Sequence, residues 1–265
     1  MAGGPGLFAG TAGFYSRYRP GYPSAEFDVI SDEAGLDGSS EVLDLGCGPG
    51  TMTLPLADRA GTITAVDADR EMLDEGARLA VQSGHDNIRW AHLSAEDFED
   101  QPATYRAVVI GSAFHWMNRD LVAAKAHRLL ARGGVLAVVG NPTPLIQVRQ
   151  RRGVGGAIAT VQGRWMPNSA ASPSVDGLSR PEQVIAASPF GTSTVRHVPT
   201  EQHWDIPRLV GFLRSTSFRP DHVLGDQFDD FVTDLTQAVL AVEPTGRWAL
   251  HASVEMVIAH KQAHT

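Results

Sequence analysis

A cluster of glycines follows a short apolar segment near the start of the chain, in the sequence DLGCGPGT at positions 44–51. Glycines let the backbone turn sharply and approach a ligand closely, because no Cβ stands in the way. Asp67 ends the next strand-like segment, where a carboxylate can accept hydrogen bonds from both hydroxyls of a ribose. In open α/β sheets, ligands bind beyond the carboxyl ends of the strands. The two features together predict a nucleoside ligand.

The spacing of these glycines distinguishes two classes of nucleotide-binding loop. Dinucleotide-binding folds use G-x-G-x-x-G, in which the third glycine permits close helix packing beneath a pyrophosphate. This chain has G-x-G-x-G, Thr51 stands where the third glycine would fall, and Pro49 stiffens the loop. The spacing therefore disfavours a dinucleotide, and an NAD(P)-dependent oxidoreductase is kept as an alternative.

Strand-like and helix-like segments alternate between residues 25 and 140, which predicts a parallel sheet with helices on both faces. Short apolar runs indicate the strands and 3.6-residue periodicity indicates the helices. The predicted strands are 41–45, 63–66, 88–93, 107–110 and 135–139, and the predicted helices are 25–35, 51–60, 70–83 and 121–131.

The residue composition changes on both sides of this region, and the regular alternation stops. Residues 1–24 are rich in glycine, aromatic residues and arginine, and we expect a loop or short helix that packs on another part of the protein. Prolines punctuate residues 141–190, which we interpret as a cap insertion with helices near 145–162 and after Ser179. Residues 191–265 are expected to return to the sheet with strands at 193–198 and 252–259 and helices at 206–215 and 228–242.

Composition limits the classes of partner. The formal net charge is -8 and the sequence pI is about 5.6, so the chain carries no overall positive charge to attract nucleic acid or an anionic membrane. The single cysteine, Cys47, cannot form an intramolecular disulfide, and no apolar segment is long enough to span a bilayer. We therefore expect a cytoplasmic protein, a monomer or homodimer, with a small-molecule partner. The chain has only two lysines, Lys125 and Lys261, which we interpret as the compositional bias of a bacterial genome.

Four segments carry a family resemblance: VLDLGCGPG at 42–50, the acidic segment at 66–73, SAEDF at 94–98 and GSAFHW at 111–116. They resemble motifs of the class I S-adenosylmethionine-dependent methyltransferases, in the small-molecule branch called the type 11 methyltransferase domain. The segment at 15–23 is similar to an N-terminal signature of that branch. The resemblance implies a doubly wound, seven-stranded Rossmann-like sheet, mostly parallel with an antiparallel C-terminal strand, plus a helical cap. It also implies S-adenosyl-L-methionine as the cofactor and S-adenosyl-L-homocysteine as the product.

The resemblance also implies roles for individual residues. Asp67 would hold the ribose, Asp97 or Glu96 would meet the adenine amino group, and Arg19 would pair with the methionine carboxylate. Asp44 would steady the loop or accept from the ammonium group, and residues 1–24 would cover the cofactor. The full predicted cofactor-binding set is Tyr15, Arg19, Asp44, Gly46, Gly48, Asp67, Ala68, Ala95, Glu96, Asp97 and Ser112.

His115 is the candidate for chemistry, since imidazole titrates near neutral pH and this position is expected beside the transferred methyl group. Methyl transfer from a sulfonium is an in-line displacement that alignment and desolvation can drive without a base. His115 would then orient the acceptor or deprotonate it, or else bond only to backbone beside Trp116. The predicted acceptor-binding set is Tyr18, Tyr22, His115, Trp116, Trp165 and Trp204, and no metal site is predicted.

These observations favour methyl transfer to oxygen, nitrogen or carbon of a small molecule. Aromatic residues in the expected cap suggest an aromatic natural-product intermediate as the acceptor. Two further alternatives stay open beside the oxidoreductase. The acceptor is tRNA or protein, which the acidic pI disfavours, or the chain binds S-adenosylmethionine without transferring a methyl group.

Overall fold

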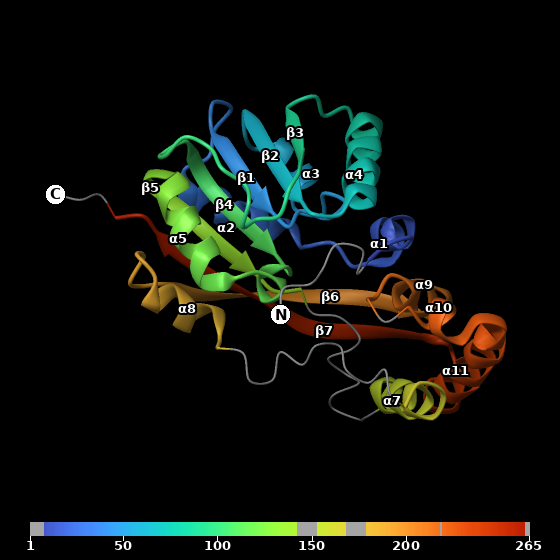
Figure 1. The fold of residues 1–265 in the computed structure, drawn as a ribbon. Helices are drawn as coiled ribbons and strands as arrows, with labels where there is room; N and C mark the ends of the chain where they lie inside the picture. Colours follow the sequence, from blue (N-terminus) through green and yellow to red (C-terminus); the bar gives the residue numbers. More distant parts are fainter. Residues whose placement is uncertain (1–7, 142–152, 168–178, 218, 263–265) are drawn as a thin grey trace.

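The computed structural model describes residues 8–141, 153–167, 179–217 and 219–262 (Figure 1). Within these residues the strands form one seven-stranded sheet in the order β3-β2-β1-β4-β5-β7-β6. The strands are β1 (Glu41–Leu45), β2 (Thr62–Asp67), β3 (Ile88–His92), β4 (Tyr105–Gly111), β5 (Leu130–Val139), β6 (Thr194–Asp205) and β7 (Arg247–His260).

The described helices lie on both faces of the sheet and in a separate group beyond it (Figure 1). They are α1 (Ala12–Tyr18), α2 (Ser24–Ala34), α3 (Thr53–Ala57), α4 (Arg70–Ser83), α5 (Arg119–Leu129), α7 (Gly153–Trp165), α8 (Pro181–Ala187), α9 (Ile206–Arg214), α10 (Pro220–Leu224) and α11 (Phe228–Val242), with 3₁₀ turns η1 (Phe114–Trp116) and η2 (Gly225–Gln227).

Strand directions confirm the predicted sheet. β3, β2, β1, β4 and β5 are parallel neighbours, β7 runs antiparallel to β5, and β6 runs antiparallel to β7. The C-terminal strand is thus the antiparallel one among those described. The strand order reverses between β1 and β4, and in open α/β sheets such a reversal creates a crevice at the carboxyl edge. Ligand-binding residues are therefore expected at the ends of β1, β2 and β4.

Two apolar layers hold the sheet. One layer packs α2 and α3 on one face through residues such as Phe27, Ile30 and Leu56. The other packs α5 and α8 on the opposite face through residues such as Val122, Leu129 and Ile185. These side chains are almost fully removed from water, and each large one contributes about 1.5–3 kcal/mol to folding.

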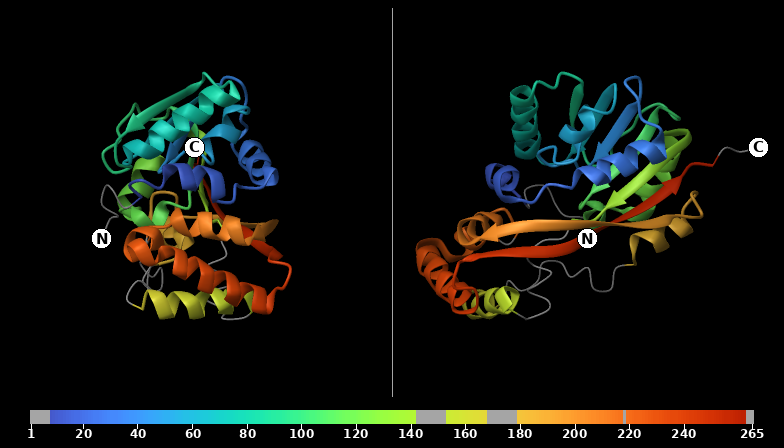
Figure 2. Two further views of the ribbon diagram at one scale, coloured as in Figure 1. Left: turned by 90° about the vertical axis from the view of Figure 1, so that its right-hand side faces the viewer. Right: turned by 180° about the vertical axis from the view of Figure 1, so that it is seen from behind.

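A third apolar cluster forms a cap at one end of the molecule. β6 and β7 extend well past the other strands, and their far ends carry α7, α9, α10 and α11 (Figure 2). The buried side chains of this cluster include Ile158, Val161, Trp204, Leu209, Phe212, Phe231 and Leu235. α1 connects the two parts of the molecule, because it contacts both α4 and α9.

The structure differs from the predicted division into segments at residues 141–190. α8 falls within residues 141–190, which were expected to form the cap, yet it packs against α5 of the core. α7 starts at Gly153, and the earlier part of the helix predicted from 145 lies outside the described residues. Among the described residues, no helix is both long enough and apolar enough to cross a membrane.

Candidate functional site

The glycine loop after β1 has the backbone conformation that its sequence predicts. Gly46, Gly48 and Gly50 have φ angles of 69°, 54° and 83°, a region that favours glycine. A Cβ on Gly46 would lie 2.6 Å from the Cβ of Ala113. The same Cβ on Gly48 would meet nothing within 4 Å, so this residue leaves open space beside the loop.

Asp67, at the end of β2, fastens the glycine loop. Its Oδ2 accepts from the N–H of Gly48 and its Oδ1 from the N–H of Asp69, both at 2.8 Å. The next carboxylate, Asp69, caps α4 by accepting from the N–H of Glu71 at 2.9 Å. Asp69, and not Asp67, is therefore the N-cap of α4. Burial raises the pKa of Asp67, opposed by the two backbone hydrogen bonds.

Asp44 lies on β1 just before the loop and is buried. Thr53, in the first turn of α3, donates to its Oδ2 at 2.6 Å, and its Oδ1 has no hydrogen-bond partner among the described residues. Burial raises the pKa of Asp44 to about 7, although the bond from Thr53 opposes the shift. A buried carboxylate oxygen without a partner can receive a donor from a ligand.

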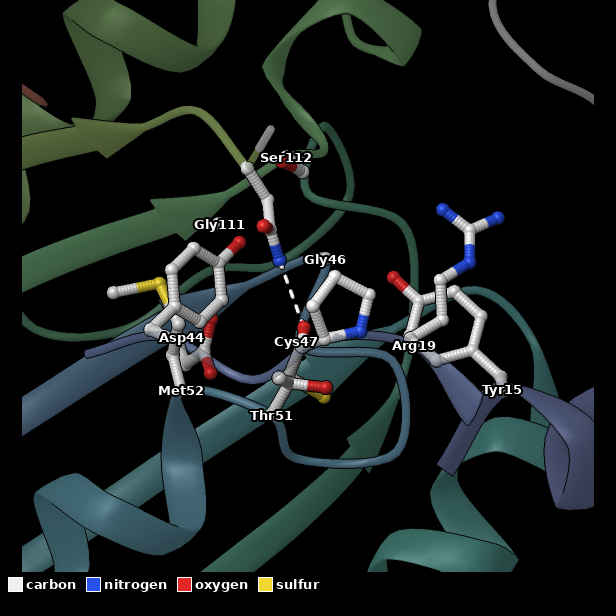
Figure 3. Close-up of a pocket in the computed structure, with 12 residues that line it drawn as sticks. Tyr15, Arg19, Asp44, Gly46, Cys47, Thr51, Met52, Gly111 and Ser112 are labelled. Atoms are coloured by element: carbon white, nitrogen blue, oxygen red, sulfur yellow. Dashed lines mark hydrogen bonds between the residues drawn. The ribbon is translucent and has the colours of Figure 1, made fainter. Parts of the chain in front are cut away.

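A small pocket of about 40 Å³ opens beside Asp44 (Figure 3). Arg19 reaches it from the end of α1, with its guanidinium 4.6 Å from the ring centroid of Tyr15. Burial lowers the pKa of Arg19, whose Nε and Nη2 donate to the Oγ and O of Ser215 at 2.9 and 3.0 Å. The lining residues are Tyr15, Arg19, Pro20, Tyr22, Asp44, Gly46, Cys47, Thr51, Met52, Gly111, Ser112 and Asn141.

The end of β4 separates this pocket from a larger cavity. Ser112 has a φ of 49°, uncommon for a residue with a Cβ, and its N–H donates to the O of Val139 at 2.8 Å. A Cβ on Gly111 would lie 2.4 Å from the Sδ of Met52 and 2.9 Å from the Tyr22 hydroxyl. Glycine at 111 thus lets Tyr22 approach the strand, and burial raises the pKa of this phenol.

The larger cavity has a volume of about 760 Å³ and runs along the carboxyl edge from β4 to β3. Ligand pockets commonly fall between about 300 and 1,000 Å³, so it is large enough for a nucleoside with a bulky substituent. Its lining residues are Phe8, Tyr15, Gly46, Gly48, Asp67, Ala68, Asp69, Met72, His92, Leu93, Ser94, Ala95, Glu96, Asp97, Gly111, Ser112, Ala113, Trp116, Met117 and Asn118.

The turn after β3 presents two carboxylates to this cavity, each already bonded once. Ser94 donates its hydroxyl to the Oδ2 of Asp97 at 2.7 Å and accepts from the N–H of Asp97 at 3.0 Å. Glu96 accepts at Oε1 from the N–H of Asn118 at 2.6 Å. Each carboxylate has a second oxygen, so both can still accept from a ligand.

Three aromatic rings stand together along the cavity. Phe8 lies edge-on to Tyr15 at a centroid distance of 6.2 Å and to Trp116 at 6.3 Å. The segment that carries Phe8 and Tyr15 is fastened to α4, where the hydroxyl of Ser16 donates to Glu75 at 2.6 Å. The rings thus join the N-terminal segment to the end of β4 beside the cavity.

His115 lies in η1 beside Trp116, with ring centroids 4.7 Å apart. The residue is exposed, and it lines neither the small pocket nor the larger cavity. Partial shielding of the ring from water lowers the pKa of His115 although the residue is exposed, and the charge of Arg119 adds to the shift. The imidazole is therefore mainly neutral at pH 7 and able to accept a proton.

The structure brings most of the predicted site residues to these two pockets, and packs three predicted acceptor-binding residues in or against the cap. Trp204 is 2% exposed and packs edge-on against Phe212. Trp165 donates its Nε1–H to Asp234 at 2.7 Å, and Tyr18 packs against Gly211 of α9. Neither pocket is lined by these three residues.

Several residues beside the site were not predicted. Asn141 lines the small pocket and donates to the O of Pro20 at 2.9 Å, while Ser215 holds Arg19 from the cap. Lys125 lies under the turn after β3. Contacts between residues so far apart in sequence leave no local pattern, except that Lys125 interrupts the apolar face of a predicted helix.

Comparisons with known proteins show similarity to methyltransferases. A sequence model of the family described as "Methyltransferase domain" matches residues 42–134. Two uncharacterised methyltransferases of Mycobacterium tuberculosis are each 32% identical, over 130 residues (49% of this chain, 64% of that protein) and 134 residues (51% of each). The chain thus spans between about half and two thirds of the length of these relatives.

Solved structures resemble the whole described fold. A candidate type II methyltransferase from Anaeromyxobacter dehalogenans has a TM-score of 0.62 at 20% identity, covering 93% of this chain and all of that one. The [4+2]-cyclase SpnF has a TM-score of 0.54 at 16% identity, covering 93% and 84%.

A third similar structure is that of a phosphoethanolamine N-methyltransferase of Haemonchus contortus, which contains S-adenosylhomocysteine. Its TM-score is 0.55 at 13% identity, covering 95% of this chain and 57% of that one. Identities this low show the fold alone, whereas the matched segment at 42–134 contains the glycine loop, Asp67 and the turn after β3. Residues 42–134 thus match the methyltransferase domain family, and the chain has the Rossmann-like fold of solved methyltransferase structures.

Proposed function

We propose that this chain transfers a methyl group from S-adenosylmethionine to a small organic acceptor. One observation carries the proposal. Residues at the ends of β1, β2, β3 and β4 line two adjoining pockets. The small pocket contains a carboxyl group, Asp44, and a guanidinium group, Arg19, and the larger cavity has room for a nucleoside. A ligand with a zwitterionic head and an adenosine body has this division of charge and size.

The residues present fit the charged head of such a ligand. Arg19 is the cation of the small pocket, and its described partners, the Oγ and O of Ser215, are uncharged. A buried cation of this kind favours an anionic partner, here the methionine carboxylate. The unpartnered Oδ1 of Asp44 would accept from the ammonium group. Because that ammonium favours the carboxylate form, binding should lower the pKa of Asp44 from about 7.

The larger cavity fits the nucleoside part. Asp67 would accept from the ribose hydroxyls, since each of its oxygens accepts one backbone N–H and has a second lone pair available. Glu96 or Asp97 would accept from the adenine amino group, and the buried Ala95 lies between β3 and these acids. Gly48 leaves the open space in which a ligand can approach the backbone.

When bound, S-adenosylmethionine supplies an electrophilic methyl group on a positively charged sulfur. The protein's own contribution is then alignment and exclusion of water, which can account for much of the barrier in such a displacement. Phe8, Tyr15 and Trp116 exclude water along one side of the cavity. His115, mainly neutral at pH 7, would orient the acceptor or hold its proton at a ring nitrogen.

The acceptor is proposed to be a small organic molecule methylated on oxygen, nitrogen or carbon. An aromatic natural-product intermediate is supported by the rings of Phe8, Tyr15 and Trp116 at the large cavity, since aromatic surfaces stack on one another. The net charge of -8 supports a small molecule over nucleic acid. A cytoplasmic location and a monomeric or dimeric state stay predictions.

A second candidate function is binding of S-adenosylmethionine without methyl transfer. The similarity to SpnF, a [4+2]-cyclase, favours keeping it, because a protein of this fold can carry a different activity. The oxidoreductase alternative is weaker. Thr51 stands where a dinucleotide-binding loop would have its third glycine. Thr51 and Asp44 both line the small pocket, and the carboxylate of Asp44 would repel a pyrophosphate.

Calorimetric titration with S-adenosylhomocysteine, NADH and NADPH separates these candidates. We expect micromolar or tighter binding of the sulfur nucleoside and no heat from either dinucleotide. Binding of a dinucleotide alone would overturn the proposal. Incubation with methyl-labelled S-adenosylmethionine and a panel of phenols, amines and carboxylic acids then tests transfer. Ligand binding without formation of S-adenosylhomocysteine across the panel would favour the binding module.

A further inference from the structure

One of the chain's two lysines is buried in the core beneath the larger cavity. Lys125 is 6% exposed and projects from the face of α5 that packs into the apolar layer. A buried ammonium is costly unless each of its three donors finds an acceptor. The fully buried neighbours on the same helix are apolar, namely Val122, Ala123, Ala126 and Leu129. The partners of Lys125 must therefore come from another element.

All three donors find acceptors in the segment that follows β3. The Nζ of Lys125 donates to the O of Glu96, to the O of Phe98 at 2.7 Å and to the Oε1 of Glu99 at 3.1 Å. Two of these acceptors are main-chain carbonyls of the turn at 94–98. Lys125 thus holds the backbone of the turn, with one side chain as its third partner.

The same turn forms one wall of the larger cavity, from Ser94 to Asp97. The peptide between Glu96 and Asp97 is held on both sides. Its carbonyl accepts from Lys125, and its N–H donates to the Oγ of Ser94 at 3.0 Å. Because a peptide is planar, bonds at both ends fix the plane. Fixing this plane sets the directions in which the side chains of Glu96 and Asp97 leave the backbone.

α5 holds the turn at a second point. The N–H of Asn118, which caps this helix, donates to the Oε1 of Glu96 at 2.6 Å. Asn118 and Lys125 are separated by two turns of helix, about 10 Å along the axis. One rigid helix therefore positions the turn at a side chain and at its backbone. Such support by packed secondary structure keeps binding groups in a defined geometry.

We propose that Lys125 is a positioning residue for base recognition, which holds the turn at 94–98 so that its acidic side chains select adenine. This inference rests on the proposed function, because it takes the larger cavity to be the nucleoside site. Lys125 does not line the larger cavity, so it would act through the turn. Its loss should therefore change which base is preferred, whereas a purely structural residue would change only stability.

Lys261 offers a matched control within the same chain. Its Nζ also donates to two main-chain carbonyls, those of Leu130 at 2.7 Å and Arg128 at 3.4 Å. These carbonyls lie at the end of α5 and the start of β5, at the amino edge of the sheet, opposite the cavity. Lys125→Met and Lys261→Met thus remove the same kind of contact, in one case from the cavity wall and in the other from residues that do not line the cavity.

The test measures binding of S-adenosylhomocysteine and S-inosylhomocysteine, in which a carbonyl oxygen replaces the adenine amino group. We expect the wild type to prefer the adenine form by about tenfold or more, since a carboxylate cannot bond to that oxygen. Lys125→Met should weaken binding of the adenine form about tenfold, as loss of groups that orient direct ligand contacts commonly does. It should also reduce the preference for adenine, while Lys261→Met should leave the preference unchanged.

Each outcome has a defined meaning. If the wild type does not bind S-adenosylhomocysteine, the proposed function fails. If the wild type binds and Lys125→Met keeps the same adenine preference, only the role of Lys125 fails. Lys125→Arg, which keeps the cation but not its compact shape, serves where the methionine variant unfolds, with a partly reduced preference expected. If both variants unfold while Lys261→Met folds, Lys125 belongs to the fold, and the inference is overturned.

Discussion

The core site and the cap are both rich in side chains that bind ligands in other proteins, but they are built differently. At the core, short sequence segments reach one edge of the sheet and are held there by backbone hydrogen bonds, as Asp67 holds Gly48 and Asp69. In the cap, Trp204, Phe212 and Phe231 belong to one apolar cluster, and none of the three lines the small pocket or the larger cavity. Polar groups at strand ends therefore identify the site better than aromatic content does.

Substitution of Trp204 should separate the two regions most strongly. Trp204→Ala removes a buried ring from the centre of the cap, so the free energy of unfolding should fall by about 3–5 kcal/mol. Affinity for S-adenosylhomocysteine should stay within about twofold, because Trp204 lines neither pocket. Urea denaturation and calorimetry measure the two quantities.

Trp116→Ala is the matched control for this prediction. Trp116 is only half-buried and lines the larger cavity, so its loss should weaken binding more than it weakens the fold. The comparison fails if Trp204→Ala lowers the affinity more than Trp116→Ala does in protein that is still folded.

Asp67→Ala should have the largest effect on binding. Loss of two hydrogen bonds to a charged acceptor, at about 1.5–3 kcal/mol each, should lower affinity for S-adenosylhomocysteine by at least about a hundredfold. Stability should also fall by about 1–3 kcal/mol, because the N–H groups of Gly48 and Asp69 lose their acceptor. Calorimetry and thermal unfolding measure both effects.

Asp205→Ala is the control from the cap. Asp205 also accepts from a backbone N–H, that of Arg208 at 2.8 Å, as the N-cap of α9. It should lose about 1 kcal/mol of stability with no change in ligand affinity. Equal losses of affinity in the two variants would contradict the assignment of Asp67 to the site.

Glu26, on α2 of the core, should make the stability of the protein depend on pH. It is 0% exposed, neither carboxylate oxygen has a hydrogen-bond partner among the described residues, and burial raises its pKa to about 8. Between pH 4.5 and 8 the folded state then holds a proton that the unfolded state has released. Stability should therefore fall as pH rises through this window, by at most about 1.4 kcal/mol per pH unit.

Glu26→Gln should flatten this dependence, as urea denaturation at several pH values would show. Part of the slope should persist, because the raised pKa of Asp44, about 7, acts in the same direction. An unchanged slope in the variant would mean that Glu26 is ionised in the folded protein.

How well the sequence predicts each region follows from the range of the contacts. β1, α4 and α11 have the predicted bounds, since their apolar periodicity and flanking turns are local. β6 and β7 are much longer than predicted. Pro199 within β6 and the polar residues after it do not resemble a strand, yet an edge strand tolerates proline because one side needs no partner.

The residues of the site also fall into those that local sequence predicts and those that depend on long-range contacts. The glycine loop, Asp67 and the turn at 94–98 lie in short segments whose places follow from strand order, and they line the cavity together. Trp165 and Trp204 were assigned to the acceptor on residue type alone, which does not separate a ring that binds a ligand from one that packs a core. Asn141, Ser215 and Lys125 depend on contacts across more than 25 residues, which only the fold specifies.

His115 is expected to give the smallest effect, and it lies beside Trp116, which lines the larger cavity. His115→Ala should lower turnover about tenfold and leave the affinity for S-adenosylhomocysteine unchanged, because the ring lines neither pocket. The lowered pKa predicts that the wild-type rate declines only at pH values below about 6.5, where the imidazole gains a proton.

His115→Gln separates positioning from proton transfer, since an amide can hydrogen-bond but does not titrate in this range. If His115 only orients the acceptor, the glutamine variant should recover much of the rate and lose the decline at acid pH. If it accepts a proton, both variants should be equally slow. A loss of stability with normal turnover in both would instead place His115 with the cap aromatics, as a residue that packs against Trp116 and takes no part in the reaction.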